Sequence, residues 1–126
     1  MKIEIRAIRN EEAVHFLKEN HTRNEVVFDT DSDFWLGAFF NEKLIGVNGI
    51  CYKKNYFKNK SLFVKKNFRK NGCAKLLSKK IIELFGHEKM IAYARPISVY
   101  FYEKYFGFKT IQKFKNGTEK MVRIIK

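Results

Sequence analysis

The strongest constraint on the fold is a pair of apolar segments that lie almost end to end. FWLGAFF, residues 34–40, is followed by KLIGVNGICY, residues 43–52, and the residues NEK, of which Lys43 already belongs to the second segment, form the connection. Both segments are rich in the aromatic and aliphatic residues that favour strands, and so short a connection predicts an antiparallel hairpin. The remaining elements must therefore be arranged around a β-hairpin.

The other segments alternate between strand and helix periodicities. Further strands are predicted at 2–8, 60–65, 88–94, 108–114 and 120–126, and helices at 10–20, 73–85 and 98–106. The polar segment 21–33 gives no clear prediction. In the second helix, the residues expected to face the core are Ala74, Leu77, Ile81 and Leu84. The order β-α-β-β-β-α-β-α-β-β indicates an α/β or α+β fold in which helices cover a sheet.

Length and composition restrict the class of protein. With 126 residues the chain is expected to form one domain over residues 1–126. No run approaches the roughly 18 apolar residues of a membrane span, and the alternating, charged N-terminus does not resemble a signal peptide. Cys51 and Cys73 follow no metal spacing, so reduced thiols, no metal and a cytoplasmic location are expected.

The charge distribution predicts a polyanionic partner. The net charge is +13, and residues 43–82 contain twelve basic residues and no acidic one. Lysines are usually solvated surface residues, but so uneven a distribution favours a phosphate-bearing cofactor, a nucleic acid, or both.

The segment SLFVKKNFRKNGCAKLL, residues 61–77, has the features of an anion site. It runs from a strand through Gly72 into the start of a helix, where free N–H groups and the helix dipole favour negative charge. Arg69, Lys70 and Lys75 can neutralise a phosphate there, and Gly72 and Ala74 allow its close approach. The spacing matches neither common nucleotide-binding loop. A solvated basic turn is the alternative.

The same residues resemble a family signature. VKKNFRKNGCAKLL resembles the R/Q-x-x-G-x-G/A acyl-CoA motif of the GNAT superfamily of N-acetyltransferases, with Arg69, Gly72 and Ala74 at its defined positions. RPISVYFYEKYFGF, residues 95–108, resembles the C-terminal motif of that family, and the element order matches over nearly the whole chain. The resemblance implies a mixed, mostly antiparallel central sheet flanked by helices.

The resemblance also implies a cofactor and a reaction. The expected activity is direct transfer of an acetyl group from acetyl-CoA to an amine acceptor. By resemblance, the residues expected to hold the cofactor are Leu62, Phe63, Val64, Arg69, Lys70, Asn71, Gly72, Cys73, Ala74, Lys75 and Arg95. Arg95 departs from the family, which often has Asn at this position. Cys73 occupies a variable position of the loop and is not expected to be a nucleophile.

Tyr102 is the candidate general acid by the same resemblance. A phenol with a pKa of about 10 is protonated at neutral pH and can protonate a departing thiolate. The alternative is a core role, since Tyr102 shares a helix face with Val99 and Phe106. The segment has one residue more before Gly107 than the family motif, so a shifted helix end is expected.

The acceptor is not determined by the sequence. Glu25, Asp29, Asp31 and Asp33 are hypothesised to bind a cationic amine, the alternative being a solvated acidic loop. Two other functions remain open, namely modification of a DNA or RNA base and non-catalytic binding of CoA or nucleic acid. No feature separates a monomer from a homodimer.

Overall fold

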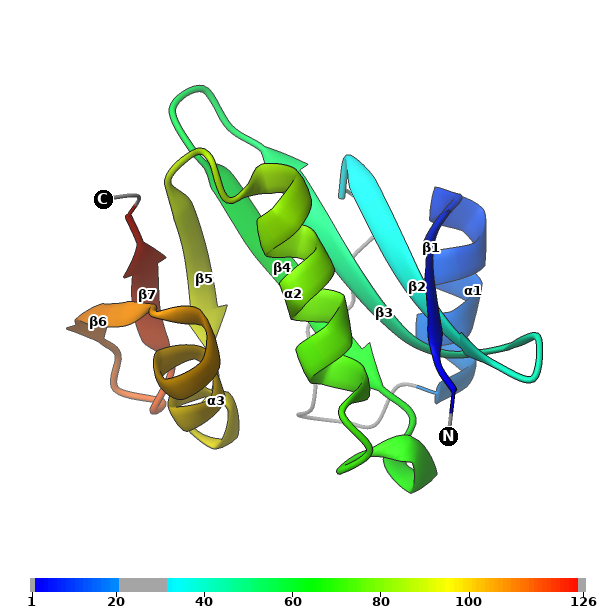
Figure 1. Cartoon of the computed structure of the whole chain (residues 1–126). Helices are drawn as coiled ribbons and strands as arrows, with labels where there is room; N and C mark the ends of the chain where they lie inside the picture. The colour runs from blue at the N-terminus through cyan, green and yellow to red at the C-terminus, as the bar shows by residue number, and fades with distance from the viewer. Residues whose placement is uncertain (1, 21–31, 125–126) are drawn as a thin grey trace.

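The structure is a computed structural model that describes residues 2–20 and 32–124. In these residues seven strands form one sheet in the order β1-β2-β3-β4-β5-β7-β6 (Figure 1). The strands are β1 (Glu4–Ile8), β2 (Phe34–Phe40), β3 (Lys43–Tyr52), β4 (Phe57–Val64), β5 (Met90–Ala94), β6 (Lys109–Lys113) and β7 (Glu119–Arg123). The helices are α1 (Asn10–Asn20), α2 (Cys73–Phe85), α3 (Pro96–Phe106) and the short 3₁₀ turn η1 (Lys66–Phe68).

The predicted hairpin is confirmed and forms the middle of one half of the sheet. β2 and β3 pair in antiparallel register from Phe34↔Ile50 to Phe40↔Lys43. Asn41 and Glu42 connect them with φ angles of 51° and 63°. Two successive positive φ values characterise the turn whose twist matches that of antiparallel strands. All other strand pairs are antiparallel except β4–β5, so the predicted mixed, mostly antiparallel sheet is also confirmed.

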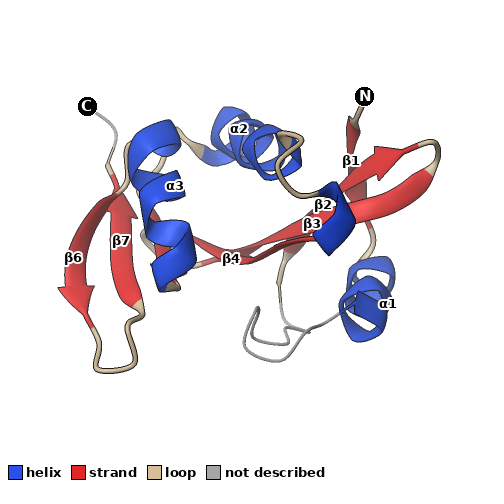
Figure 2. Cartoon of the chain, turned by 90° about the horizontal axis from the view of Figure 1, so that it is seen from below, coloured by secondary structure: helices blue, strands red, loops and turns tan. Residues whose placement is uncertain are grey.

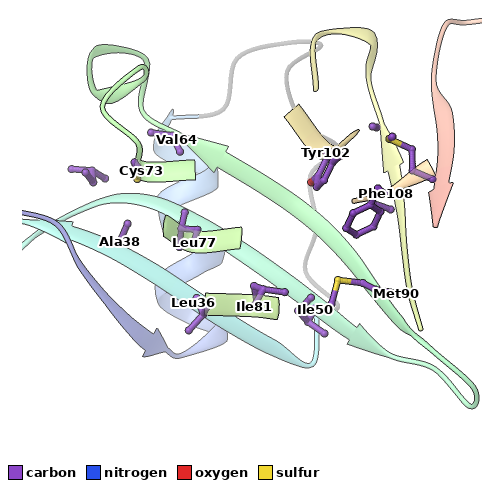
Figure 3. Packing of buried hydrophobic residues seen from close by; sticks show 14 residues of the cluster. Leu36, Ala38, Ile50, Val64, Cys73, Leu77, Ile81, Met90, Tyr102 and Phe108 are labelled. Carbon is purple, nitrogen blue, oxygen red and sulfur yellow. The ribbon is translucent and has the colours of Figure 1, made fainter. Parts of the chain in front are cut away.

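Helices cover both faces of the sheet (Figure 2). α2 and α3 lie on one face, and α1 lies on the other face near β1 and β2. Beneath α2, Leu77 and Ile81 are fully buried in a cluster with Ile50 and Met90 (Figure 3). A second, smaller cluster packs α1 against Trp35, Val47 and Phe63; these two cores fix the helices on the sheet.

Three local predictions need correction. Leu84 is 40% exposed rather than in the core, because the buried stripe of α2 consists of Cys73, Leu77, Ser78 and Ile81. At this end of the helix Phe85 contacts the sheet instead, with its ring centroid 4.9 Å from that of Phe57. β4 begins at Phe57 rather than Lys60, and α3 begins at Pro96, where proline's fixed φ suits the first helical position.

Candidate functional site

The central feature of the site is the separation of β4 and β5. Their parallel ladder contains three pairs, Phe57↔Met90, Lys58↔Ile91 and Asn59↔Ala92, after which the strands diverge (Figure 1). Ser61, with a φ of 57°, lies where the β3–β4 register shifts. Such a bulge bends the strand and increases its twist. β4 therefore leaves β5 and opens the sheet in its middle.

A cavity of about 390 Å³ occupies this opening. β4 contributes one wall, and the end of β5 with the start and middle of α3 contributes the other. The lining residues are Lys58, Asn59, Lys60, Ser61, Leu62, Tyr93, Ala94, Arg95, Ser98 and Tyr102. Leu62, Arg95 and Tyr102, which the sequence placed in one site, therefore meet in one cavity.

Tyr102 is a buried member of this wall. It is 6% exposed, and its ring centroid lies 5.2 Å from that of Phe108 (Figure 3). The ring centroid of Phe101 lies 5.8 Å away. Burial raises the pKa of the Tyr102 hydroxyl above its ordinary value, so the group is protonated at neutral pH. The core contacts that the sequence offered as an alternative role are present, and so is access to the cavity.

The end of α3 accommodates the one residue by which the segment before Gly107 exceeds the family motif. The N–H groups of Gly107 and Phe108 both donate to the carbonyl oxygen of Tyr102, and Gly107 adopts a left-handed conformation with φ 67°. These bonds span more residues than an ordinary α-helical turn. The expected shift at the helix end is therefore a widened last turn, and Tyr102 stays on the inner face.

A second cavity, of about 280 Å³, lies over the loop between β4 and α2. Its lining residues are Val64, Arg69, Lys70, Gly72, Cys73, Ala74, Lys75, Phe101 and Tyr105. Gly72 precedes the first turn of α2 in a left-handed conformation with φ 80°, and a Cβ added there would meet nothing within 4 Å. No described side chain caps this helix start. The first-turn N–H groups are thus donors next to open space, as an anion site requires.

Two side chains of the loop anchor it to the strand end. Arg69 donates from Nε to the carbonyl oxygen of Val64 at 2.8 Å, and its guanidinium carbon lies 5.2 Å from the Phe63 ring centroid. Asn71 donates to the carbonyl oxygen of Phe68 at 3.4 Å. Arg69 therefore holds the loop in shape as well as adding positive charge.

The two lysines that line the second cavity are exposed. Lys70 has a left-handed φ of 69°, and the Lys75 ammonium lies 4.9 Å from the Tyr105 ring centroid on α3. Lys75 thus spans the two helices on either side of the second cavity.

Cys73 lies under the loop rather than at its surface. It is 2% exposed, and burial raises the pKa of its thiol to about 11. A Cβ added at Gly46 of β3 would lie 3.1 Å from its sulfur, which shows how closely the helix start packs on the sheet. Because thiolate is the reactive form, this thiol is poorly suited to nucleophilic chemistry.

The remaining predicted residues lie in different places. Phe63 points to the other face of the sheet, where its ring centroid lies 6.1 Å from that of Phe16 on α1. The Asp33 carboxylate accepts a hydrogen bond of 2.7 Å from the Tyr52 backbone N–H and does not line either cavity described above. Glu25, Asp29 and Asp31 lie outside the described residues.

Several cavity residues were missed from the sequence. Lys58 and Asn59 precede Lys60, where the sequence predicts that the strand begins, and the pattern around Tyr93 predicts a strand but no site. The length of β3 is a sequence signal for an earlier start of β4. A ten-residue strand needs a hairpin partner of similar length, and the eight-residue β4 begins at Phe57. The buried bond from Asn48 to Asn59, 2.7 Å long, had no sequence signal.

Two further findings concern other site classes. In the part of the chain that the structure describes, no cluster of three His, Cys, Asp or Glu side chains could hold a metal ion. Among the same residues, no helix is long and apolar enough to cross a membrane.

Comparison with known proteins gives a family and a set of similar folds. A family model described as an acetyltransferase (GNAT) domain matches residues 4–123. No curated protein matches the chain by sequence.

Solved structures of similar fold cover nearly the whole chain. A PaiA N-acetyltransferase from Thermoplasma acidophilum, in complex with coenzyme A, is 19% identical with a TM-score of 0.75, covering 99% of this chain and 100% of the other. Arabidopsis thaliana Naa50, in complex with the bisubstrate analogue CoA-Ac-MVNAL, is 14% identical with a TM-score of 0.78 and 97% coverage of both chains.

A GNAT-family acetyltransferase from Streptococcus pneumoniae is 18% identical with a TM-score of 0.77, covering 98% and 100%. These likenesses agree with the fold that the sequence motifs implied. Because the family model spans all seven strands and the three α-helices of the described residues, this chain belongs to the GNAT acetyltransferase family.

Proposed function

We propose that this protein is an acyl-CoA-dependent N-acyltransferase that moves an acetyl group from acetyl-CoA to an amine, with Tyr102 as the general acid. The observation that supports this most is the opening between β4 and β5, where Tyr102 and Leu62 line one cavity and the open loop before α2 lines a second. Family membership and the CoA-bound structural neighbours support the same reaction class.

The described residues fit the parts of the cofactor. Its phosphates suit the start of α2, where Gly72 leaves open space and Lys70 and Lys75 supply positive charge. Beyond Asn59, β4 no longer pairs with β5, so this edge offers backbone groups to an amide-bearing chain. Acetyl-CoA supplies an activated acetyl thioester. Transfer of that acetyl group to the amine would form a carbon–nitrogen bond, break the carbon–sulfur bond, and release CoA and a proton from the nitrogen.

In this proposal, the protonated hydroxyl of Tyr102 acts on the departing sulfur of CoA. The Tyr102 hydroxyl keeps its proton at neutral pH, as an ordinary phenol does, and burial raises its pKa further. A thiol with an ordinary pKa of about 8.5 is the stronger acid, so Tyr102 stabilises the developing thiolate chiefly by donating a hydrogen bond. General acid catalysis contributes roughly 100- to 10,000-fold, and for so weak an acid the low end of that range is expected.

The first experiment measures CoA release and product mass. The protein is incubated with acetyl-CoA and a panel of amines, peptides and oligonucleotides, and a mass increase of one acetyl group identifies the acceptor. CoA binding without any acetylated product would favour the alternative of a non-catalytic CoA-binding module. Acetylated oligonucleotide in preference to every amine would favour the nucleic-acid-directed alternative.

The role of Tyr102 is tested by a matched pair of substitutions on α3. Tyr102→Phe is expected to lower kcat about 100-fold and to leave CoA affinity nearly unchanged. Tyr100→Phe is the control, because Tyr100 lies on the same helix but is 64% exposed. Equal rates for Tyr102→Phe and the parent protein would disprove the general-acid assignment.

A further inference from the structure

The opening between β4 and β5 carries positive charge on the side away from α2. Asn59 is in register with Ile50, a core residue beneath α2. Because side chains alternate along a strand, Lys58 and Lys60 point to the other side of the sheet. There the Lys58 ammonium lies 4.9 Å from the ring centroid of Tyr93, which is 45% exposed.

The lining of this cavity carries positive charge. Lys58 and Arg95 contribute two cations to it, and none of its described lining residues is acidic. Lys120 adds a third cation nearby, 5.9 Å from the same Tyr93 ring centroid and paired with Tyr93 across β5 and β7. Clefts lined by one sign of charge concentrate ligands of the opposite sign.

These cations are distinct from those of the phosphate loop. The two cavities share no lining residue, and the loop has Arg69, Lys70 and Lys75 of its own. A cofactor whose phosphates bind at the start of α2 would be neutralised by Arg69, Lys70 and Lys75. Lys58 therefore faces a molecule that enters the opening from the sheet face opposite α2. Arg95, for which the resemblance implied a cofactor contact, lines the same cavity as Lys58 rather than the cavity over the phosphate loop.

We propose that the acceptor is an amine that carries an anionic group, a carboxylate or a phosphate, close to its nitrogen, and that Lys58 and Arg95 bind that group. This inference rests on the proposed N-acetyltransferase function. A polyamine would be repelled by the same charges. Arg95 can bind either anion with two parallel hydrogen bonds, and Lys58 acts as a point charge.

The test compares small acceptors that differ in this group. β-Alanine supplies a carboxylate, phosphoethanolamine a phosphate and β-alaninamide neither. For each, kcat/KM is measured from CoA release in the parent protein and in Lys58→Gln and Arg95→Gln. For each protein, kcat/KM for an anionic amine is divided by kcat/KM for β-alaninamide to give an anionic-to-neutral ratio. Comparing this ratio between the parent and a variant cancels differences in the intrinsic reactivity of the amines.

Each substitution is expected to lower the anionic-to-neutral ratio roughly tenfold or more, the effect of losing one charge-assisted hydrogen bond. Lys43→Gln is the control for net charge, because Lys43 is exposed at the far end of β3 and lines neither cavity. It is expected to leave the ratio unchanged. Comparison of β-alanine with phosphoethanolamine then identifies which anion is preferred.

Two results would overturn the inference. One is acetylation of β-alaninamide as fast as of either anionic amine, which would leave the acetyltransferase function standing. The other needs no turnover: in the presence of CoA, N-acetyl-β-alanine would bind no more tightly than N-acetyl-β-alaninamide. Failure of every amine to release CoA would instead count against the proposed function, and the binding comparison would still decide the inference.

Discussion

Gly72 provides a sharp test of the cofactor site. Its role in the backbone conformation at the start of α2 can be separated from its role in leaving space for a phosphate of CoA. Gly72 adopts a left-handed conformation with φ 80° at the start of α2, and it lines the cavity over the loop. Gly107 at the end of α3 is a matched control, since its φ is 67° and a Cβ there would also meet nothing within 4 Å. Gly72→Ala and Gly107→Ala therefore impose the same kind of backbone strain at two different places.

The magnitudes follow from this geometry. An alanine in the left-handed region costs about 1–2 kcal/mol, and neither position adds a steric clash. For a domain of this size that corresponds to a decrease in Tm of about 4–8 °C for each variant. Only the Cβ at position 72 would project into the space that we propose for a phosphate of CoA. Loss of one charge-assisted hydrogen bond there would weaken CoA binding roughly 10- to 100-fold.

The assay combines thermal unfolding with calorimetric titration of CoA. Both variants are expected to unfold at similarly lowered temperatures, while only Gly72→Ala loses CoA affinity. If Gly72→Ala binds CoA as tightly as Gly107→Ala does, a phosphate does not approach this loop and the cofactor has been placed wrongly.

The remaining predictions concern the core and the buried thiol. Leu77→Ala, at a fully buried position, is expected to reduce the free energy of unfolding in urea by about 2–5 kcal/mol. Leu84→Ala, seven residues along the same helix but 40% exposed, should change it by less than about 1 kcal/mol; equal losses would contradict the buried stripe described for α2. Burial raises the pKa of Cys73 to about 11, so between about pH 9 and 11 the unfolded state loses a proton that the folded state retains, and stability should fall as the pH rises through this range. Cys73→Ala should reduce the dependence of the unfolding free energy on pH, as measured by urea titrations at several pH values. An unchanged pH dependence would show that other groups cause it.

Much of the fold could be predicted because its elements are defined by neighbouring residues. The hairpin at 34–52 was evident because a short connection between two apolar segments leaves little alternative to antiparallel pairing. Gly72 marked the start of α2 for a similar reason, since a left-handed residue is needed there and glycine adopts it without strain. The errors at Leu84 and at the start of β4 arose near element ends, where a periodic pattern no longer fixes the boundary.

The sequence by itself determined the order of the elements, the basic loop and the candidacy of Tyr102. The tertiary structure decided that β4 and β5 pair over three residues and then separate, which places Leu62, Arg95 and Tyr102 around one cavity. It also brought Lys58 of β4, Tyr93 of β5 and Lys120 of β7 together on one face. The physical reason is that a local pattern specifies backbone conformation, whereas the length of a strand ladder and the neighbours of a side chain depend on residues far away in the chain.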